Sequence, residues 1–228
     1  MEFKLLIFTL GFVPGMLLRL APFKKLITIK QWITLASAYT ILLAANWYLL
    51  AFVYHNPSIN MSTALFKNDV FAFGILVSCA NILILRKHIK EQIFTCGLIM
   101  LQDLIVVSAV TYLLNQLINM YSYNFDVILI IGIYCLIIQL IFYWFFRKLI
   151  VDTVRPFLSL HADNYWNGIW FISTIIFMSC FFSMPWNADD TINVLIARLL
   201  QYIVIVALCH TMTSTGLSIK QKLELEKD

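Results

Sequence analysis

Residues 86–118 read RKHIKEQIFTCGLIMLQDLIVVSAVTYLLNQLI, a basic connection followed by an apolar run that covers residues 94–118. A helix rises about 1.5 Å per residue, so about 20 residues cross the ~30 Å hydrocarbon core of a bilayer. The run is therefore long enough to span a membrane. A basic connection beside a long apolar run recurs along the chain, and this repetition decides the predicted fold.

Six further apolar runs accompany this one, at residues 3–20, 32–54, 70–85, 125–146, 166–184 and 193–213. Backbone groups in lipid must be bonded internally, so only helices and closed barrels cross a bilayer. The runs are continuous rather than alternating, which favours helices. Pro14 is expected to kink the first of them. The sequence predicts an all-α, polytopic membrane protein with a bundle of seven transmembrane helices.

The basic residues are distributed unevenly among the connections. Lys and Arg collect after the first, third, fifth and seventh runs, and only Lys4, Lys67 and Arg198 lie elsewhere. Positively charged residues beside membrane spans stay in the cytoplasm. We therefore expect the N-terminus outside and the C-terminus inside. The 13 cytoplasmic residues are Arg19, Lys24, Lys25, Lys30, Arg86, Lys87, Lys90, Arg147, Lys148, Arg155, Lys220, Lys222 and Lys227.

Composition supports a chain that is surrounded mainly by lipid. Hydrophobic residues make up 61% of the chain and charged residues 12%, whereas soluble domains have about 25% charged residues. We expect a multi-pass membrane protein whose main partner is the lipid bilayer. The net charge of +4 follows from the basic cytoplasmic loops, so no nucleic-acid partner is invoked.

Nothing in the sequence points to a cofactor or a metal. The chain contains no HExxH zinc motif, no P-loop and no glycine-rich nucleotide lid. The last apolar run contains no lysine that would hold retinal. As it stands, the chain is not expected to carry out ATP chemistry, and no catalytic residue is assigned.

Two ionisable residues inside the apolar runs are candidates for a functional polar core. A charge at the centre of a bilayer costs at least ~2.5 kcal/mol, so such residues are functional suspects. Asp103 and Arg198 are expected within ~10 Å of each other in depth. Three outcomes stay open: a structural ion pair, a pair that also lines a ligand pocket or acts as a switch, or no direct contact. Gln102 and Gln201 are best placed to extend this core.

The C-terminal part is expected to continue the last span into the cytoplasm. Residues 217–228, LSIKQKLELEKD, are polar and rich in helix formers, and Gly216 at the junction is a candidate flexible joint. We therefore divide the chain into a seven-helix transmembrane domain, residues 1–213, which the resemblance described below implies is a sensor domain, and the start of a cytoplasmic linker or coiled-coil helix, residues 214–228. The longest cytoplasmic loop is expected at residues 147–165, with a bend at Pro156.

Three stretches carry a resemblance to a known family: GFVPGMLLRLAPFKK at 11–25, VRPFLSLHADNYW leading into WNGIWFISTIIFMSCFFSMPW at 154–186, and ARLLQYIVIVALCHTM at 197–212 leading into KQKLELEKD. They resemble the N-terminal membrane sensor region of bacterial GHKL-type sensor histidine kinases, which include peptide quorum-sensing receptors. The resemblance implies a multi-pass protein of the bacterial cytoplasmic membrane, two-component signalling, a homodimer, a downstream kinase domain and a response regulator.

If this resemblance holds, the ligand would be an extracellular small molecule or peptide. The outer loops are short, so such a ligand would bind among the outer helix ends. Aromatic residues expected there, with Trp47 and Trp186 foremost, suit a small amphipathic or apolar molecule.

Two other functions stay open. A small transporter or channel needs a path lined by polar groups, for which Asp103, Asn115 and Gln116 are the only indications. A membrane peptidase would need a Cys–His pair, for which His88 and Cys96 are the candidates.

Overall fold

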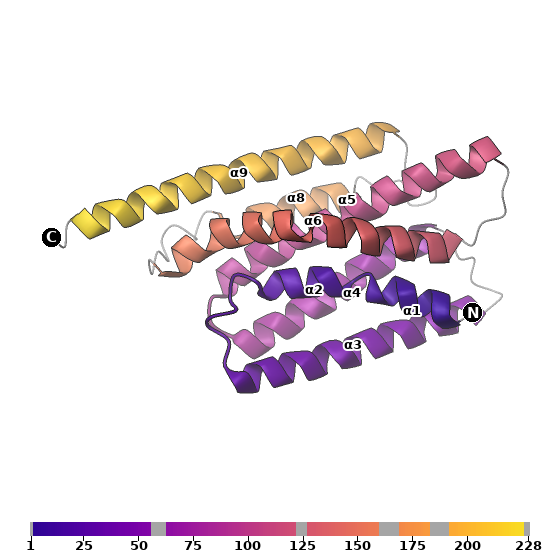
Figure 1. Cartoon of the computed structure of the whole chain (residues 1–228), viewed down its shortest axis with the longest axis horizontal. Helices are drawn as coiled ribbons and strands as arrows, with labels where there is room; N and C mark the ends of the chain where they lie inside the picture. The colour runs from indigo at the N-terminus through magenta and orange to yellow at the C-terminus, as the bar shows by residue number, and fades with distance from the viewer. Residues whose placement is uncertain (1, 56–62, 122–126, 160–168, 183–191, 226–228) are drawn as a thin grey trace.

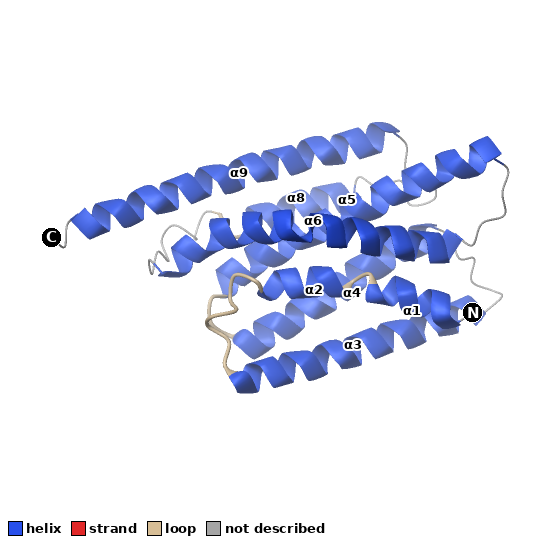
Figure 2. Cartoon of the chain, viewed as in Figure 1, coloured by secondary structure: helices blue, strands red, loops and turns tan. Residues whose placement is uncertain are grey.

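The computed structural model describes residues 2–55, 63–121, 127–159, 169–182 and 192–225. Within these ranges every regular element is a helix and no strand occurs (Figure 2), which confirms the all-α prediction. The helices lie side by side in a bundle (Figure 1). They are α1 (Glu2–Leu10), α2 (Val13–Leu20), α3 (Ile29–His55), α4 (Thr63–Leu85), α5 (Ile89–Tyr121), α6 (Val127–Ser159), α8 (Ile172–Phe182) and α9 (Ile192–Leu225).

Three helices are long and apolar enough to cross a membrane, judged by length and composition over the described residues. They cover Ile29–Phe52 of α3, Ile89–Val110 of α5 and Ile192–Ser218 of α9. Shorter apolar helices cover Leu6–Leu20, Phe71–Leu85 and Ile172–Phe182. These helices indicate a membrane protein, because a single soluble domain rarely contains several apolar helices of this length.

The first apolar run is broken into two helices. The interruption falls at Gly11 and Phe12, and Pro14 occupies the first turn of α2. Proline has no backbone N–H, so at position 14 it cannot continue the hydrogen-bond ladder from Leu10. The first turn of a new helix needs no such donor, which makes the position suitable for proline. The predicted kink is thus an interruption that begins three residues before Pro14.

α5 is the central helix of the bundle. It contacts α2, α4, α6, α8 and α9. Of the residues in its most apolar stretch, 89% are buried inside the protein. The corresponding values for α3 and α9 are 22% and 17%. These two helices lie at opposite edges of the bundle (Figure 1). Their outward faces are apolar, with side chains such as Ile33 and Ile203 more than 60% exposed. A lipid environment suits such faces.

Glycines allow the closest helix–helix approaches. A Cβ atom on Gly97 of α5 would lie 2.7 Å from the backbone nitrogen of Thr174 and 2.7 Å from Oγ of Ser173, both on α8. A Cβ on Gly132 of α6 would lie 3.0 Å from the backbone of Phe8 in α1. Small residues at helix contacts are typical of membrane bundles, because they let backbones approach and gain van der Waals contact.

The connections with basic residues lie at one end of the bundle. The α2–α3 connection, the α4–α5 turn and the C-terminal ends of α6 and α9 are together there, whereas the first turn of α1, the last turn of α5 and the first turn of α6 lie at the other end (Figure 1). Lys24, Lys87 and Lys148 are exposed at this end, which we call the basic end. Arg147 lies 5.3 Å over the ring of Trp144, a typical cation–π contact.

Two sequence predictions about the chain's connections were wrong. The stretch expected as a cytoplasmic loop, residues 147–165, is helical as far as Ser159, where α6 ends, so the bend expected at position 156 does not occur; residues 160–165 lie outside the described residues. A proline in the last turn removes only one helical hydrogen bond, so the helix survives it. The second concerns Arg19, which was expected in a cytoplasmic connection but is only 3% exposed inside the bundle.

Candidate functional site: a buried polar centre

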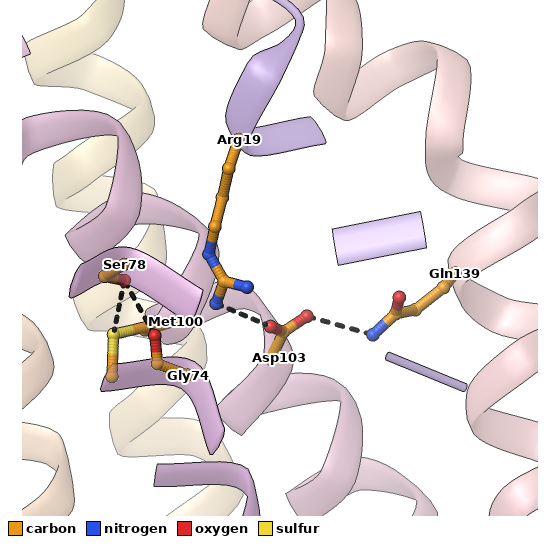
Figure 3. A network of polar contacts seen from close by, with 6 residues as sticks. All are labelled: Arg19, Gly74, Ser78, Met100, Asp103 and Gln139. Carbon is orange, nitrogen blue, oxygen red and sulfur yellow. Dashed lines mark hydrogen bonds and ion pairs between the residues drawn. The ribbon is translucent and has the colours of Figure 1, made fainter. Parts of the chain in front are cut away.

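Three polar side chains from three helices meet inside the bundle, and we call them the polar centre (Figure 3). Arg19 comes from α2, Asp103 from α5 and Gln139 from α6. Nη2 of Arg19 lies 3.5 Å from Oδ2 of Asp103, and Nε2 of Gln139 donates a hydrogen bond of 2.9 Å to Oδ1. None of the three side chains belongs to a residue more than 4% exposed. The carboxylate therefore ties α2 and α6 to the central helix.

Arg19 lies in the last turn of α2, and its side chain is buried inside the bundle. The helix stops at Leu20, and the chain then passes through a series of turns before α3 begins at Ile29. Phe23 and Ile27 of this connection are buried and cover the end of the bundle. Arg19 is therefore separated from the basic end by an apolar layer, and its charge needs a partner inside the protein.

Two glycines lie beside the charged groups. A Cβ atom on Gly15 would lie 3.1 Å from both carboxylate oxygens of Asp103. A Cβ on Gly74 of α4 would lie 3.5 Å from Nη2 of Arg19 and 3.2 Å from the methyl carbon of Met100. Gly15 therefore leaves space that the carboxylate of Asp103 occupies, whereas a Cβ on Gly74 would be tight only against the side chain of Met100.

The charges in the polar centre depend on each other for stability. Removing one member of a buried ion pair leaves an uncompensated charge, at a typical cost of about 3–5 kcal/mol. Both oxygens of Asp103 are engaged, but Nε of Arg19 and Oε1 of Gln139 have no hydrogen-bond partner among the described residues. One carboxylate is thus shared by two donors from different helices, and a shift of α2 or α6 changes how it is shared.

A second set of polar contacts joins the neighbouring helices. The hydroxyl of Tyr39 in α3 donates a hydrogen bond of 2.6 Å to Oδ1 of Asn81 in α4, and both residues are buried. Ser78 of α4 donates to the carbonyl of Gly74 at 2.7 Å and lies 3.9 Å from the sulfur of Met100 in α5 (Figure 3). Polar contacts therefore extend across α3, α4, α5, α2 and α6.

The ion partner of Asp103 is Arg19 and not Arg198. Of the three outcomes expected for Asp103 and Arg198, the described residues show the one without direct contact. Arg198 lies on α9, where it is 2% exposed. A similar depth in the membrane was the reason for pairing the two residues, but depth does not say which helices are neighbours. The cation that lies beside Asp103 is Arg19 of α2.

The two glutamines expected beside this core lie in different surroundings. Gln102 is 2% exposed, and neither atom of its amide has a hydrogen-bond partner among the described residues. It is adjacent to Asp103 in sequence but takes no part in the polar centre. Gln201 of α9 accepts a hydrogen bond from the thiol of Cys180, so it links α9 to α8.

The ligand site expected at the outer helix ends is only partly visible. Trp47 is half-buried and packs against the apolar core. Trp186 lies outside the described residues. These two residues therefore leave the position of an outer ligand site a prediction.

The Cys–His pair expected for a peptidase is not assembled. Nδ1 of His88 lies 3.5 Å from Oε1 of Glu91 at the start of α5. Cys96 is buried further along the same helix, and a separation of eight residues corresponds to roughly 12 Å along a helix axis. The pair is too far apart for the direct proton transfer that activates a cysteine nucleophile.

Sequence reasoning missed two members of the polar centre. Arg19 was assigned to a loop, although Leu18 and Leu20 on either side of it are apolar and buried. The apolar residues on either side of Arg19 were the signal that could have distinguished it from Lys24 and Lys25. Gln139 was one of several intramembrane amides, and nothing in its neighbours distinguishes it from the others.

The fold and the polar centre define a class: an α-helical membrane protein with a buried ion pair between neighbouring helices. Comparison of the chain with protein-family models, with characterised proteins and with solved structures finds no match. The function of the protein is therefore inferred from its helices and from the polar centre.

Proposed function

We propose that the chain is a seven-span membrane sensor module whose last helix carries a conformational signal to the cytoplasm, as in a two-component histidine kinase. The observation that supports this function most directly is α9, an unbroken helix of 34 residues. Its length of about 50 Å exceeds the ~30 Å hydrocarbon core of a bilayer. Its C-terminal end projects past the other helices at the basic end (Figure 1).

Seven spans are our interpretation of the helices as a set. α1 and α2 together form the first, α3, α4, α5 and α6 the next four, and α8 and α9 the last two. The basic end supports an orientation with the N-terminus outside and the C-terminus in the cytoplasm, because Lys and Arg beside membrane spans favour the cytoplasmic side. In this orientation the polar tail of α9 lies where a kinase domain would act.

The packing of α9 suits a helix that moves as one body. Its buried stripe contains Ile205, Cys209 and Met212, each no more than 1% exposed. Thr213 makes a hydroxyl contact of 3.4 Å with Thr153 of α6. On the other side Leu200 and Ile203 are about 60% exposed. A helix held along one stripe shifts against its neighbours at lower cost than an enclosed one.

Gly216, a candidate flexible joint from the sequence, lies within a continuous helix. α9 continues without interruption through position 216, and the helix ends only at Leu225. A continuous helix transmits rotation and translation better than a hinge does.

The ligand in this proposal is an extracellular small molecule or peptide that favours one packing of the bundle. The exposed stripe of α9 would then face lipid or the second copy in a homodimer.

Alanine insertions test whether α9 transmits a signal. One to four alanines are inserted after Ser218 in a fusion that places a bacterial kinase catalytic region after Leu225. Each inserted residue rotates the downstream part of the helix by about 100°. We expect autophosphorylation in membranes to change strongly with one and two insertions and to return toward its initial level with four. Ser218→Ala without insertion is the matched control. Equal activity for all four insertions would contradict the proposal.

Transport is the rival function, and the polar centre gives it little support. A transport path needs polar groups that water reaches, whereas Arg19, Asp103 and Gln139 are nearly inaccessible. Ion current or solute uptake in proteoliposomes separates the two functions. Flux that disappears in Asp103→Asn would favour transport over signalling.

A further inference from the structure

A small cavity at the basic end is built from three segments of the chain. It has a volume of about 180 Å³ and lies between the α2–α3 connection, the first turns of α3 and the α4–α5 turn. Phe23, Ile27 and Leu85 form an apolar part of its wall, and Gln31, Lys87 and Gln92 are among its polar residues. This volume equals that of about six water molecules in the liquid, which is enough for a small head group but not for an acyl chain.

The cationic side of the cavity is formed by a tight turn. Arg86 and His88 have positive φ angles of 30° and 59°, and Lys87 between them donates its backbone N–H to the carbonyl of Leu85. Positive φ is uncommon outside glycine, so this backbone is held in place by its surroundings. The turn places Lys87 and His88 on the cavity wall beside the N-terminus of α5. A lysine and a helix N-terminus both favour an anion.

Gln92 adds a hydrogen-bond acceptor to this cationic cavity, and it is 2% exposed. Its Nε2 donates a hydrogen bond of 2.6 Å to the carbonyl of Lys87. A carbonyl only accepts, so the amide nitrogen must face it, and Oε1 is left as an acceptor without a partner among the described residues. A buried amide oxygen repels a phosphate but accepts a hydrogen bond from a hydroxyl.

The other polar atoms near the cavity are already engaged. Oε1 of Gln31 accepts hydrogen bonds of 3.0 Å from the backbone N–H and the hydroxyl of Thr28, and its Nε2 donates to the carbonyl of Ile84 at 3.4 Å. The carboxylate of Glu91 pairs with His88. Lys87 and Gln92 are therefore the residues whose chemistry selects a ligand.

We propose that this cavity binds the head group of an anionic phospholipid whose head group also carries hydroxyls, such as phosphatidylglycerol. Lys87 faces the phosphodiester, and Gln92 accepts a head-group hydroxyl. Basic pockets between spanning helices are typical head-group sites. Leu26 and Ile29 beside the cavity are more than half exposed and apolar, so they provide a surface for the acyl chains. The site does not depend on the sensor function.

Native mass spectrometry of the purified chain in detergent micelles tests the site. Dioleoyl phosphatidylglycerol, phosphatidic acid and phosphatidylcholine are added separately. We expect retention in that order, because phosphatidic acid lacks the head-group hydroxyls and phosphatidylcholine lacks the net charge. Lys87→Gln should lower phosphatidylglycerol retention roughly fivefold, the usual effect of one basic residue on an anionic head group. Lys148→Gln, which removes a lysine at the same end but away from the cavity, is the matched control.

Gln92→Met tests the hydroxyl acceptor. This variant should reduce the retention of phosphatidylglycerol to that of phosphatidic acid, and the retention of phosphatidic acid should stay unchanged. Because this buried variant also loses the hydrogen bond to Lys87, Leu26→Trp provides a second test: it fills the cavity from an exposed position and should block phosphatidylglycerol. Equal loss in Lys87→Gln and Lys148→Gln would overturn the site. Competition by soluble glycerol 3-phosphate at equal concentration would overturn the lipid as its ligand.

Discussion

At the scale of single residues, the chain places a full positive and a full negative charge where water does not reach. Arg19 and Asp103 are both less than 5% exposed and lie 3.5 Å apart. Each is tolerated because the other is present, since an isolated charge in an apolar interior is far more costly than a paired one. Gln139 adds a hydrogen bond that fixes the orientation of the carboxylate.

Single replacements in this pair should be costly and a double replacement less so. Arg19→Met and Asp103→Asn should each lower the free energy of unfolding by about 3 kcal/mol, since each leaves an uncompensated or unsatisfied buried group. The double variant should recover at least about 1 kcal/mol of the summed loss. Unfolding by sodium dodecyl sulfate in lipid–detergent micelles measures all three.

A second double-mutant cycle distinguishes the observed partner from the expected one. Asp103→Asn combined with Arg198→Gln should be additive within roughly 0.5 kcal/mol, because residues without contact rarely couple. A coupling as large as that between Asp103 and Arg19 would mean that Arg198 is a partner of Asp103.

The glycines beside the polar centre should differ in their tolerance of alanine. Gly15→Ala places a Cβ 3.1 Å from both oxygens of Asp103, which are held by Arg19 and Gln139 and cannot easily shift. Gly74→Ala meets mainly the flexible side chain of Met100. We expect a loss of about 1–3 kcal/mol for Gly15→Ala, the usual range for overpacking, and a smaller loss for Gly74→Ala. Thermal unfolding of both variants in the same detergent compares them, and equal losses would contradict this account.

At the scale of elements, α5 organises the bundle. Its surroundings are other helices over most of its apolar length, and its contact with α8 is made at Gly97. The hydroxyl of Ser173 in α8 donates a hydrogen bond of 2.7 Å to the carbonyl of Phe94 in α5. Backbone proximity and this interhelical hydrogen bond act at the same place, so α8 is held despite its short described length.

Gly97→Ala should separate α5 from α8. Its Cβ would meet the backbone nitrogen of Thr174 at 2.7 Å, and backbone cannot rotate away. We expect a loss of at least about 2 kcal/mol, toward the upper part of the range for overpacked sites. Sodium dodecyl sulfate unfolding measures it, with Ala207→Val on the exposed face of α9 as the control.

Combining this variant with Ser173→Ala provides a further check on the contact. Removal of the serine hydroxyl eliminates one clash but leaves the backbone clash with Thr174. Rescue should therefore be partial. Full rescue would mean that side-chain crowding alone limits the approach of the two helices.

At the scale of the whole molecule, the dominant feature is a charge asymmetry between two ends. Basic connections gather at one end although they lie far apart in sequence (Figure 1). Antiparallel neighbours produce this grouping, because every second connection returns to the same end. The apolar helix faces between the two ends remain exposed, as at Ile41, Ile141 and Val204.

Cysteine labelling tests the proposed orientation. On a background without native cysteines, single cysteines replace Phe3 and Asn193 at one end and Lys24 and Lys222 at the basic end. A membrane-impermeant maleimide should label positions 3 and 193 in intact cells, and positions 24 and 222 only after permeabilisation. Labelling of position 222 from outside would reverse the orientation and remove the basis for a cytoplasmic signal.

The properties that depend on composition and local order can be predicted from the amino-acid sequence. The lengths of the apolar runs predict helices because lipid leaves the backbone no other continuous hydrogen-bonding solution. Pro14 predicts the broken first run for an equally local reason. Asp103 was identifiable because a charge inside an apolar run is costly wherever the helices pack.

The residue that pairs with Asp103 follows from the packing of the helices and not from the sequence pattern. Arg198 matched Asp103 in depth, but pairing depends on which helices are neighbours, and an apolar sequence carries little information about that choice. Arg19 lies in the last turn of α2 and is buried inside the bundle, although it was expected in a loop. Gly15 then leaves space for the carboxylate of Asp103. A local pattern fixes the cost of a buried charge, whereas the packing of distant segments provides its partner.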